Sequence, residues 1–119
     1  MIIDDQEVNI LLVSRLLQRY KKVEENQIYK CSKMAEYKKC LKDIKEKKHR
    51  DITFFVDRFM PDMKFNLIFR DIRALANSGV NVKIIAMSAD ERRSVRNEMI
   101  EAGANFFVPK SKLCLYIKG

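Results

Sequence analysis

The sequence predicts an α/β fold built on a five-stranded parallel sheet, and two features of its 119 residues support this prediction. Short apolar runs rich in β-branched and aromatic residues alternate with longer stretches of helical periodicity, which is the pattern of β-α-β units. Two of the helical stretches are followed by glycine, at Gly79 and Gly103, where helices commonly end. A chain of this length suits one core, so we expect residues 1–119 to form a single domain.

Five segments have the composition of strands in a parallel sheet, being short and rich in β-branched or aromatic residues. In chain order they are residues 1–3, 27–31, 52–56, 82–87 and 105–108. The first is only the stub of a strand, and the second is the weakest candidate of the five.

Four longer segments carry apolar residues at helical spacing and separate the predicted strands. They are residues 7–20, 34–43, 65–76 and 91–102. In the first helix we expect a broad buried face made of Val8, Ile10, Leu11, Leu12, Val13, Leu16 and Leu17. Residues 44–50 are Lys-rich and better suited to solvent, as an inserted loop or a helix extension. A last helix would begin within residues 111–119.

The composition argues against several classes of protein. The net charge is +8, and residues 21–50 supply most of it with eleven Lys and Arg against five Asp and Glu. Because no nucleic-acid-binding motif accompanies this charge, we expect a solvated surface and no nucleic-acid partner. Cys31, Cys40 and Cys114 form no C-x-x-C pair, which favours reduced thiols over a disulfide or zinc site. Without an apolar run of membrane length or a signal peptide, we expect a cytoplasmic protein that contacts no membrane.

Polar side chains follow four of the predicted strands, at the point where each strand ends. They are Asp4, Asp5, Asp57, Ser88 and Lys110. Ligands of open parallel sheets bind outside the carboxyl ends of the strands, so we expect these side chains on one rim. Three carboxylates, a hydroxyl and an ammonium indicate a Mg²⁺ ion together with a mobile phosphoryl group.

Each of these side chains has a role in that chemistry. Clustered carboxylates stay ionised only if a cation offsets their repulsion, so Asp5 and Asp57 would hold Mg²⁺ while Asp4 acts directly or through water. Asp57 would be the nucleophile toward the phosphoryl group, and Ser88 and Lys110 would contact the phosphoryl oxygens. Taken singly, the residues also have structural explanations, since the acidic pair would cap the following helix and Ser88 begins a Ser-x-x-Glu capping box.

Over about residues 2–110 the motifs resemble those of response-regulator receiver domains. That family has an acidic pair after the first strand, Asp-x-x-Met-Pro after the third, Ser or Thr with Ala after the fourth, and Lys after the fifth. These motifs stand here at residues 4–5, 57–61, 88–89 and 110. The resemblance implies a flavodoxin-like, doubly wound (βα)5 fold with strand order 2-1-3-4-5. The first strand and the last helix look clipped beside the family, which suggests a fragment of a longer protein.

The resemblance also implies a function in a phosphorelay. Asp57 would accept a phosphoryl group from a histidine kinase or a histidine phosphotransfer module, including one in a parent hybrid kinase, and would catalyse its own phosphotransfer and dephosphorylation. The backbone carbonyl of Phe59 would be a further Mg²⁺ ligand, and Ser88 and Phe107 would switch the surface on phosphorylation. The donor lies elsewhere because the sole histidine, His49, falls in a charged connector. No small-molecule substrate is implied beyond a phosphodonor.

Three positions depart from the family pattern. Phe65 stands where receivers usually have Gly, Lys64 where they often have Asp, and Ser111 where they have Pro. Because a non-prolyl cis bond costs about 2.5–4 kcal/mol, we expect the bond before Ser111 to be trans. The departures leave a pseudo-receiver, acting only as a protein-interaction module, as the alternative function. The acid after the first strand argues against a flavodoxin, and Phe59 stands where a haloacid-dehalogenase-type phosphatase needs a second acid.

Overall fold

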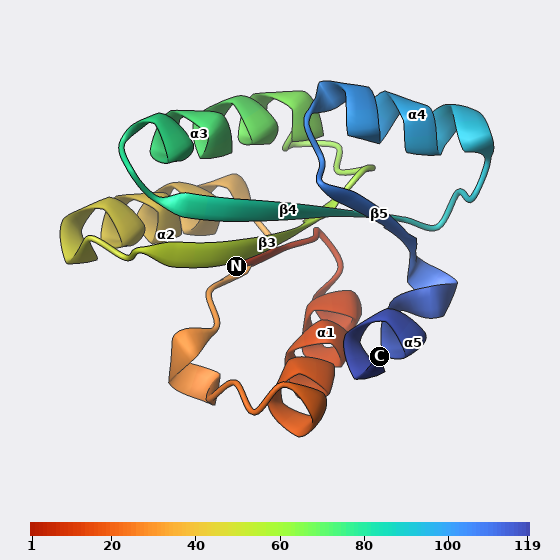
Figure 1. Cartoon of the computed structure of the whole chain (residues 1–119), viewed down its shortest axis with the longest axis horizontal. Helices are drawn as coiled ribbons and strands as arrows, with labels where there is room; N and C mark the ends of the chain where they lie inside the picture. The colour runs from red at the N-terminus through yellow and green to blue at the C-terminus, as the bar shows by residue number, and fades with distance from the viewer.

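The computed structural model describes residues 1–119 and contains a five-stranded, fully parallel sheet (Figure 1). The strands are β1 Ile2–Ile3, β2 Lys30–Cys31, β3 Asp51–Asp57, β4 Asn81–Ser88 and β5 Phe106–Pro109. Their order in the sheet is β2-β1-β3-β4-β5, which confirms the order that the family resemblance implies. Every strand therefore ends on the same edge of the sheet.

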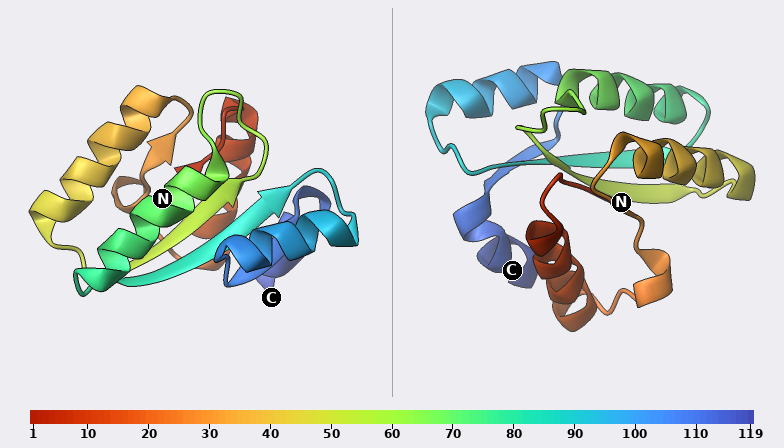
Figure 2. Two further views of the ribbon diagram at one scale, coloured as in Figure 1. Left: turned by 90° about the horizontal axis from the view of Figure 1, so that it is seen from above. Right: turned by 180° about the vertical axis from the view of Figure 1, so that it is seen from behind.

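Helices cover both faces of this sheet. They are α1 Glu7–Tyr20, α2 Met34–Lys47, α3 Phe65–Asn77, α4 Arg93–Ala102 and α5 Leu113–Lys118, with short 3₁₀ turns at Glu25–Gln27 and Lys110–Lys112. The helices α2, α3 and α4 lie on one face, and α1 and α5 lie on the other (Figures 1 and 2). The two-residue β1 and the six-residue α5 confirm that the first strand and last helix are short. None of these helices has the length and hydropathy that a membrane span requires.

The core is divided by the sheet into two clusters, because both faces of a covered parallel sheet are apolar. Along β3, Phe54 and Val56 pack beneath α2, α3 and α4, whereas Phe55 between them packs toward α1 and α5. This two-residue alternation explains why residues 52–56 are almost continuously apolar.

The buried face of α1 differs from the predicted one. Val8, Leu11 and Leu12 are 68%, 45% and 46% exposed, whereas Ile10 and Val13 are buried. Apolar residues lie on more of the surface of α1 than the core covers. The spacing of apolar residues alone therefore does not identify which face of α1 packs on the sheet. The prediction of a broad buried face was wrong for these three residues, which instead form an exposed apolar patch near the start of α1.

The Lys-rich segment after residue 43 continues α2 as far as Lys47, which confirms a helix extension rather than an inserted loop. Ile44 inside it is fully buried, so this stretch contributes to the core despite its charge. The weak strand predicted at residues 27–31 is shorter than expected, since only Lys30–Cys31 pair with β1. The backbone at Lys64 and Phe65 has no positive φ angle, so a glycine is not required at the start of α3.

Candidate functional site

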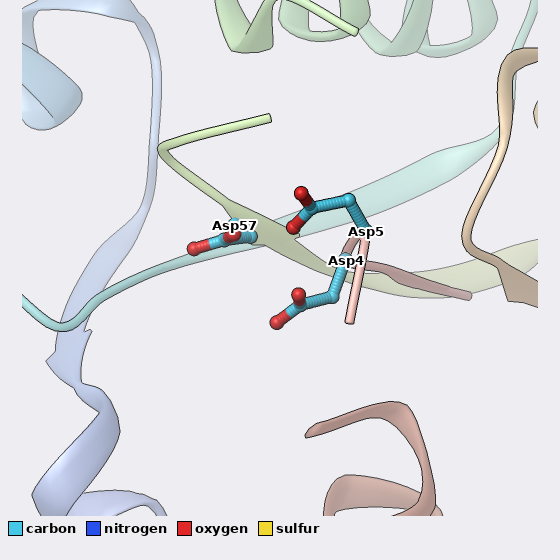
Figure 3. Close-up of side chains that lie close together, drawn as sticks. All are labelled: Asp4, Asp5 and Asp57. Atoms are coloured by element: carbon cyan, nitrogen blue, oxygen red, sulfur yellow. The ribbon is translucent and has the colours of Figure 1, made fainter. Parts of the chain in front are cut away.

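Three carboxylates meet at the carboxyl edge of the sheet. Asp57 is the last residue of β3, and Asp4 directly follows β1, whose Ile3 lies opposite Val56. One oxygen of each of Asp4, Asp5 and Asp57 lies within 4.8 Å of the others, and Figure 3 shows the three side chains beside one another. Adjacent parallel strands thus bring together acids that are more than fifty residues apart in sequence.

Lys110 supplies the cation nearest to these acids. Its Nζ lies 3.0 Å from Asp4 Oδ2 and 3.1 Å from Asp57 Oδ1, and it projects from the 3₁₀ turn that follows β5. Burial tends to lower the pKa of Lys110, but the carboxylates of Asp4 and Asp57 outweigh burial and raise it. The ammonium is therefore held in its charged form between the two acids.

Asp57 is only 4% exposed, and its environment disfavours the ionised form. Burial first, and then the neighbouring Asp4 carboxylate, raise the pKa of Asp57 from 3.8 to about 6, although Lys110 acts in the opposite direction. One ammonium does not compensate three carboxylates, so the site carries excess negative charge.

The carboxylates have free capacity for a cation. Asp4 is completely buried, and its Oδ1 accepts a hydrogen bond from the Gln6 backbone N–H at 3.0 Å. Its Oδ2 contacts the Lys110 ammonium and has no further polar partner in the chain. A buried oxygen of this kind beside two further carboxylates suits a hard divalent cation that prefers oxygen ligands. The donor set therefore fits Mg²⁺, with Asp4, Asp5 and Asp57 as the residues able to hold it.

Ser88 ends β4 and is 4% exposed, one residue beyond the point where Met87 lies opposite Asp57. Its Oγ accepts a hydrogen bond from the Asp90 backbone N–H at 3.0 Å. Because α4 begins only at Arg93, Ser88 is not the N-cap of that helix, which excludes the capping-box interpretation and shortens the helix predicted at residues 91–102.

Phe107 and Phe59 take contrasting positions. Phe107 lies on β5 opposite Ala86 and packs, half-buried, against the cluster beneath α2, α3 and α4. Phe59 lies two residues beyond the end of β3, and its side chain is exposed. The bond between Lys110 and Ser111 is trans, as predicted.

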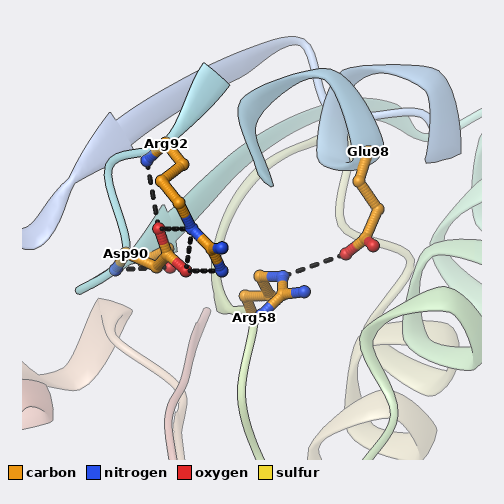
Figure 4. A network of polar contacts seen from close by, with 5 residues as sticks. Arg58, Asp90, Arg92 and Glu98 are labelled. Atoms are coloured by element: carbon orange, nitrogen blue, oxygen red, sulfur yellow. Dashed lines mark hydrogen bonds and ion pairs between the residues drawn. The ribbon is translucent and has the colours of Figure 1, made fainter. Parts of the chain in front are cut away.

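Sequence reasoning missed a set of ion pairs on the same rim. Arg58, immediately after Asp57, donates from Nε to Glu98 Oε1 on α4 at 2.9 Å, and Arg92 pairs with Asp90 in the loop after β4 (Figure 4). The Asp90–Arg92 pair could have been suggested from the sequence, because the two residues are only two positions apart. The Arg58–Glu98 pair spans forty residues and depends on how α4 docks, which no sequence pattern specifies.

The fold and the rim together define a doubly wound α/β domain with an acidic site at the carboxyl ends of its strands. Residues 1–113 match the family model for the response regulator receiver domain, and the chain belongs to this family of two-component signalling domains. No curated protein matches the chain.

Two solved structures illustrate the similarity. One is the receiver domain of the histidine kinase CKI1 from Arabidopsis thaliana in complex with Mg²⁺ and BeF₃⁻, with 26% identity, coverage of 98% of this chain and 85% of that chain, and a TM-score of 0.72. The other is the signal receiver domain of the putative response regulator NarL from Mycobacterium tuberculosis, with 17% identity, coverage of 98% and 89%, and a TM-score of 0.69. The second likeness concerns the fold alone.

Proposed function

We propose that this receiver domain accepts a phosphoryl group on Asp57 from a phosphohistidine donor in a Mg²⁺-dependent phosphorelay. The observation that carries the proposal is the position of Asp57, buried at the end of β3 and paired with the Lys110 ammonium, which also contacts the Asp4 carboxylate. A buried acid with a perturbed pKa, next to both a cation and further acids, is the kind of group that reactive centres use.

In the proposed transfer, a carboxylate oxygen of Asp57 attacks the phosphorus of the donor. A new O–P bond forms while the N–P bond of the phosphohistidine breaks, and its electron pair remains on the imidazole nitrogen. The nucleophile has to be ionised, and the raised pKa of Asp57 makes this the first requirement. When bound, Mg²⁺ would supply positive charge that offsets both the clustered carboxylates and the phosphoryl oxygens.

Lys110 and Ser88 would then stabilise the transferred group. The Lys110 ammonium already contacts Asp57 Oδ1 and would meet a phosphoryl oxygen on the same carboxylate. The hydroxyl of Ser88 accepts a hydrogen bond from Asp90, so its own proton is free to be donated to a second oxygen. Turning toward the phosphoryl group would break the contact with Asp90, and Phe107 would fill the space that Ser88 leaves.

The phosphodonor would come from another protein or domain. The only histidine, His49, precedes β3 and contacts the Tyr29 hydroxyl through Nε2 at 2.9 Å, whereas Asp57 ends that strand. The two residues thus lie at opposite ends of β3. The exposed apolar patch of Val8, Leu11 and Leu12 begins three residues after Asp5 and offers a surface on which a histidine kinase or phosphotransfer module would dock.

Intact-mass measurement tests the proposal. The chain is incubated with Mg²⁺ and acetyl phosphate, and we expect the mass to rise by one phosphoryl group in the wild type and not in Asp57→Asn, which keeps the shape but lacks the nucleophile. Full labelling of Asp57→Asn would contradict the assignment. If the wild type is labelled neither by acetyl phosphate nor by a phosphohistidine protein, the chain is instead a pseudo-receiver that acts through binding.

A further inference from the structure

Arg58 connects the phosphoacceptor strand to α4. Its backbone N–H donates to the Met87 carbonyl at 2.9 Å, which extends the pairing of β3 and β4 by one residue and fixes its main chain beside Asp57. Its side chain reaches in the direction of α4 and donates from Nε to Glu98 Oε1 at 2.9 Å. The backbone of Arg58 is thus held next to the reactive carboxylate, while its guanidinium lies at the end of a flexible side chain and can move.

The surroundings of Arg58 place its guanidinium on the rim where Ser88 lies. Figure 4 shows Arg58 between the Asp90–Arg92 pair and Glu98. The backbone of Asp90 is hydrogen-bonded to Ser88 Oγ, so this loop is part of the same site. Arg92 binds Asp90 through two nitrogens and is largely exposed. Of these two arginines, Arg58 has the single ion pair, with Glu98, and can exchange it more easily.

We propose that Arg58 exchanges Glu98 for the phosphoryl group when Asp57 is phosphorylated, and that α4 is thereby released from the end of β3. The inference rests on the proposed function, because it needs a phosphoryl group on Asp57. It assigns Arg58 as a ligand of that group and Glu98 as its competitor in the unphosphorylated state.

The relative strengths of the two contacts favour the exchange. The Arg58–Glu98 pair is partly exposed, with side chains 28% and 46% accessible, and such a pair typically changes an equilibrium constant by about 1.4- to 5-fold. A hydrogen bond from a guanidinium to a phosphoryl group typically changes an equilibrium constant by more, about 10- to 100-fold. Both groups are charged, and the planar guanidinium fits two phosphoryl oxygens at once. The phosphoryl group also carries about −1.5 to −2 charge against −1 for Glu98.

Calorimetric titration with beryllium fluoride in the presence of Mg²⁺, using the full chain, tests the exchange. We expect Glu98→Gln to bind this phosphoryl mimic about 1.4- to 5-fold more tightly than the wild type, because the competitor is gone. Arg58→Gln should bind it about 10-fold more weakly or worse, because the ligand is gone. In the double variant the gain from Glu98→Gln should vanish.

Arg92→Gln is the matched control, since it removes one positive charge from the same rim without touching the Arg58–Glu98 pair. Its affinity should stay within about 2-fold of the wild type, in line with an exposed side chain. Amide hydrogen exchange over residues 93–102 gives a second readout: exchange should rise in the wild type when the mimic binds, and in free Glu98→Gln toward that same level.

Opposite signs for the two single variants are the signature of the exchange. If both variants bind the mimic more tightly, the ion pair only restrains α4 and Arg58 is not a ligand. If neither variant changes the affinity for the mimic, the ion pair is a surface contact. Either result overturns the inference. Failure of the wild type to bind the mimic and to gain a phosphoryl group would overturn the proposed function as well. If Asp57 is labelled but the two single variants change the affinity for the mimic in the same direction, only this inference is overturned and the proposed function stands.

Discussion

Lys110 Nζ lies 3.1 Å from Asp57 Oδ1, and the same ammonium lies 3.0 Å from Asp4 Oδ2. One cation therefore pairs with two buried carboxylates, one at the end of β3 and one directly after β1. Asp4 Oδ2 contacts Lys110 and has no other polar partner within the chain. The ammonium is thus placed to affect both the stability of the metal-free protein and the chemistry at Asp57.

Replacing Lys110 by Ala should weaken both properties. Without Mg²⁺, the free energy of unfolding should fall by about 2–4 kcal/mol, because two buried acids lose their cation. Labelling of Asp57 by acetyl phosphate should slow by about 100-fold, as is typical when one preorganised donor to a developing charge is removed. Urea unfolding in chelator and time-resolved intact mass measure the two effects.

Lys112→Ala is the matched control, since Lys112 belongs to the same 3₁₀ turn and is exposed. It should leave stability and labelling rate close to those of the wild type. If Lys110→Ala behaves like this control in the labelling assay, the ammonium has no role in phosphoryl transfer.

The stability of the metal-free chain should depend on pH through Asp57. Burial and the Asp4 carboxylate raise the pKa of Asp57 from 3.8 to about 6 in the folded chain, so the folded state holds the proton more tightly than the unfolded state. The free energy of unfolding should therefore fall as the pH rises from about 4 to about 6, by on the order of 2 kcal/mol. Asp57→Asn should lack this component and be more stable than the wild type at pH 7.

Urea unfolding in chelator at pH 4.5 and pH 7 checks this dependence. The comparison is between the wild type, Asp57→Asn and Asp62→Asn, the last removing an exposed acid from the neighbouring loop. An identical fall with pH in the wild type and Asp57→Asn would show that another group is responsible.

Much of the site followed from one rule about parallel sheets. Asp57 and Lys110 stand directly after apolar runs, and the carboxyl ends of parallel strands share one edge, so their proximity could be predicted without a structure. Asp4 belongs to the same rim for the same reason. The rule needs only strand positions and chain direction, both of which leave a clear signal in short apolar runs.

Features that depend on helix docking could not be predicted in this way. The stripe of α1 that meets the sheet is set by how α1 packs against the core and α5, so Val8 was placed inside although it is exposed. Glu98 is one of several charged residues on α4, and only the position of that helix brings it to Arg58. Similarly, the burial of Ile44 in a Lys-rich stretch depends on α2 lying along the sheet.

Phe107→Ala should separate phosphorylation from its effect on the surface. The ring packs half-buried against the cluster beneath α2, α3 and α4, so its loss should cost roughly 1–2 kcal/mol of stability while leaving the acids in place. Beryllium fluoride should still bind within about 3-fold of the wild type, because Phe107 packs against the apolar cluster and supplies no group to the metal or the phosphoryl mimic. Its effect on amide exchange over residues 93–109 should be lost.

Phe106→Ala is the neighbouring control, because Phe106 is exposed on the other face of β5 and its ring centroid lies 6.2 Å from that of Tyr116. It should retain the wild-type response to beryllium fluoride. A full response in Phe107→Ala would rule out the proposed coupling through Ser88 and Phe107.

The exposed apolar patch on α1 should matter for transfer from a protein donor but not from a small molecule. Leu11 is 45% exposed in the second turn of a helix that begins two residues after Asp5, so Leu11→Asp should leave the fold and the acetyl phosphate reaction unchanged. Transfer from a phosphorylated histidine phosphotransfer protein should slow about 10-fold, because a charge then replaces apolar contact area in the docking surface. Leu67→Asp places the same charge at a comparably exposed position on α3 and should transfer normally. Equal rates for the two variants would show that the donor docks elsewhere, and a parallel loss with acetyl phosphate would show that Leu11→Asp damages the site itself.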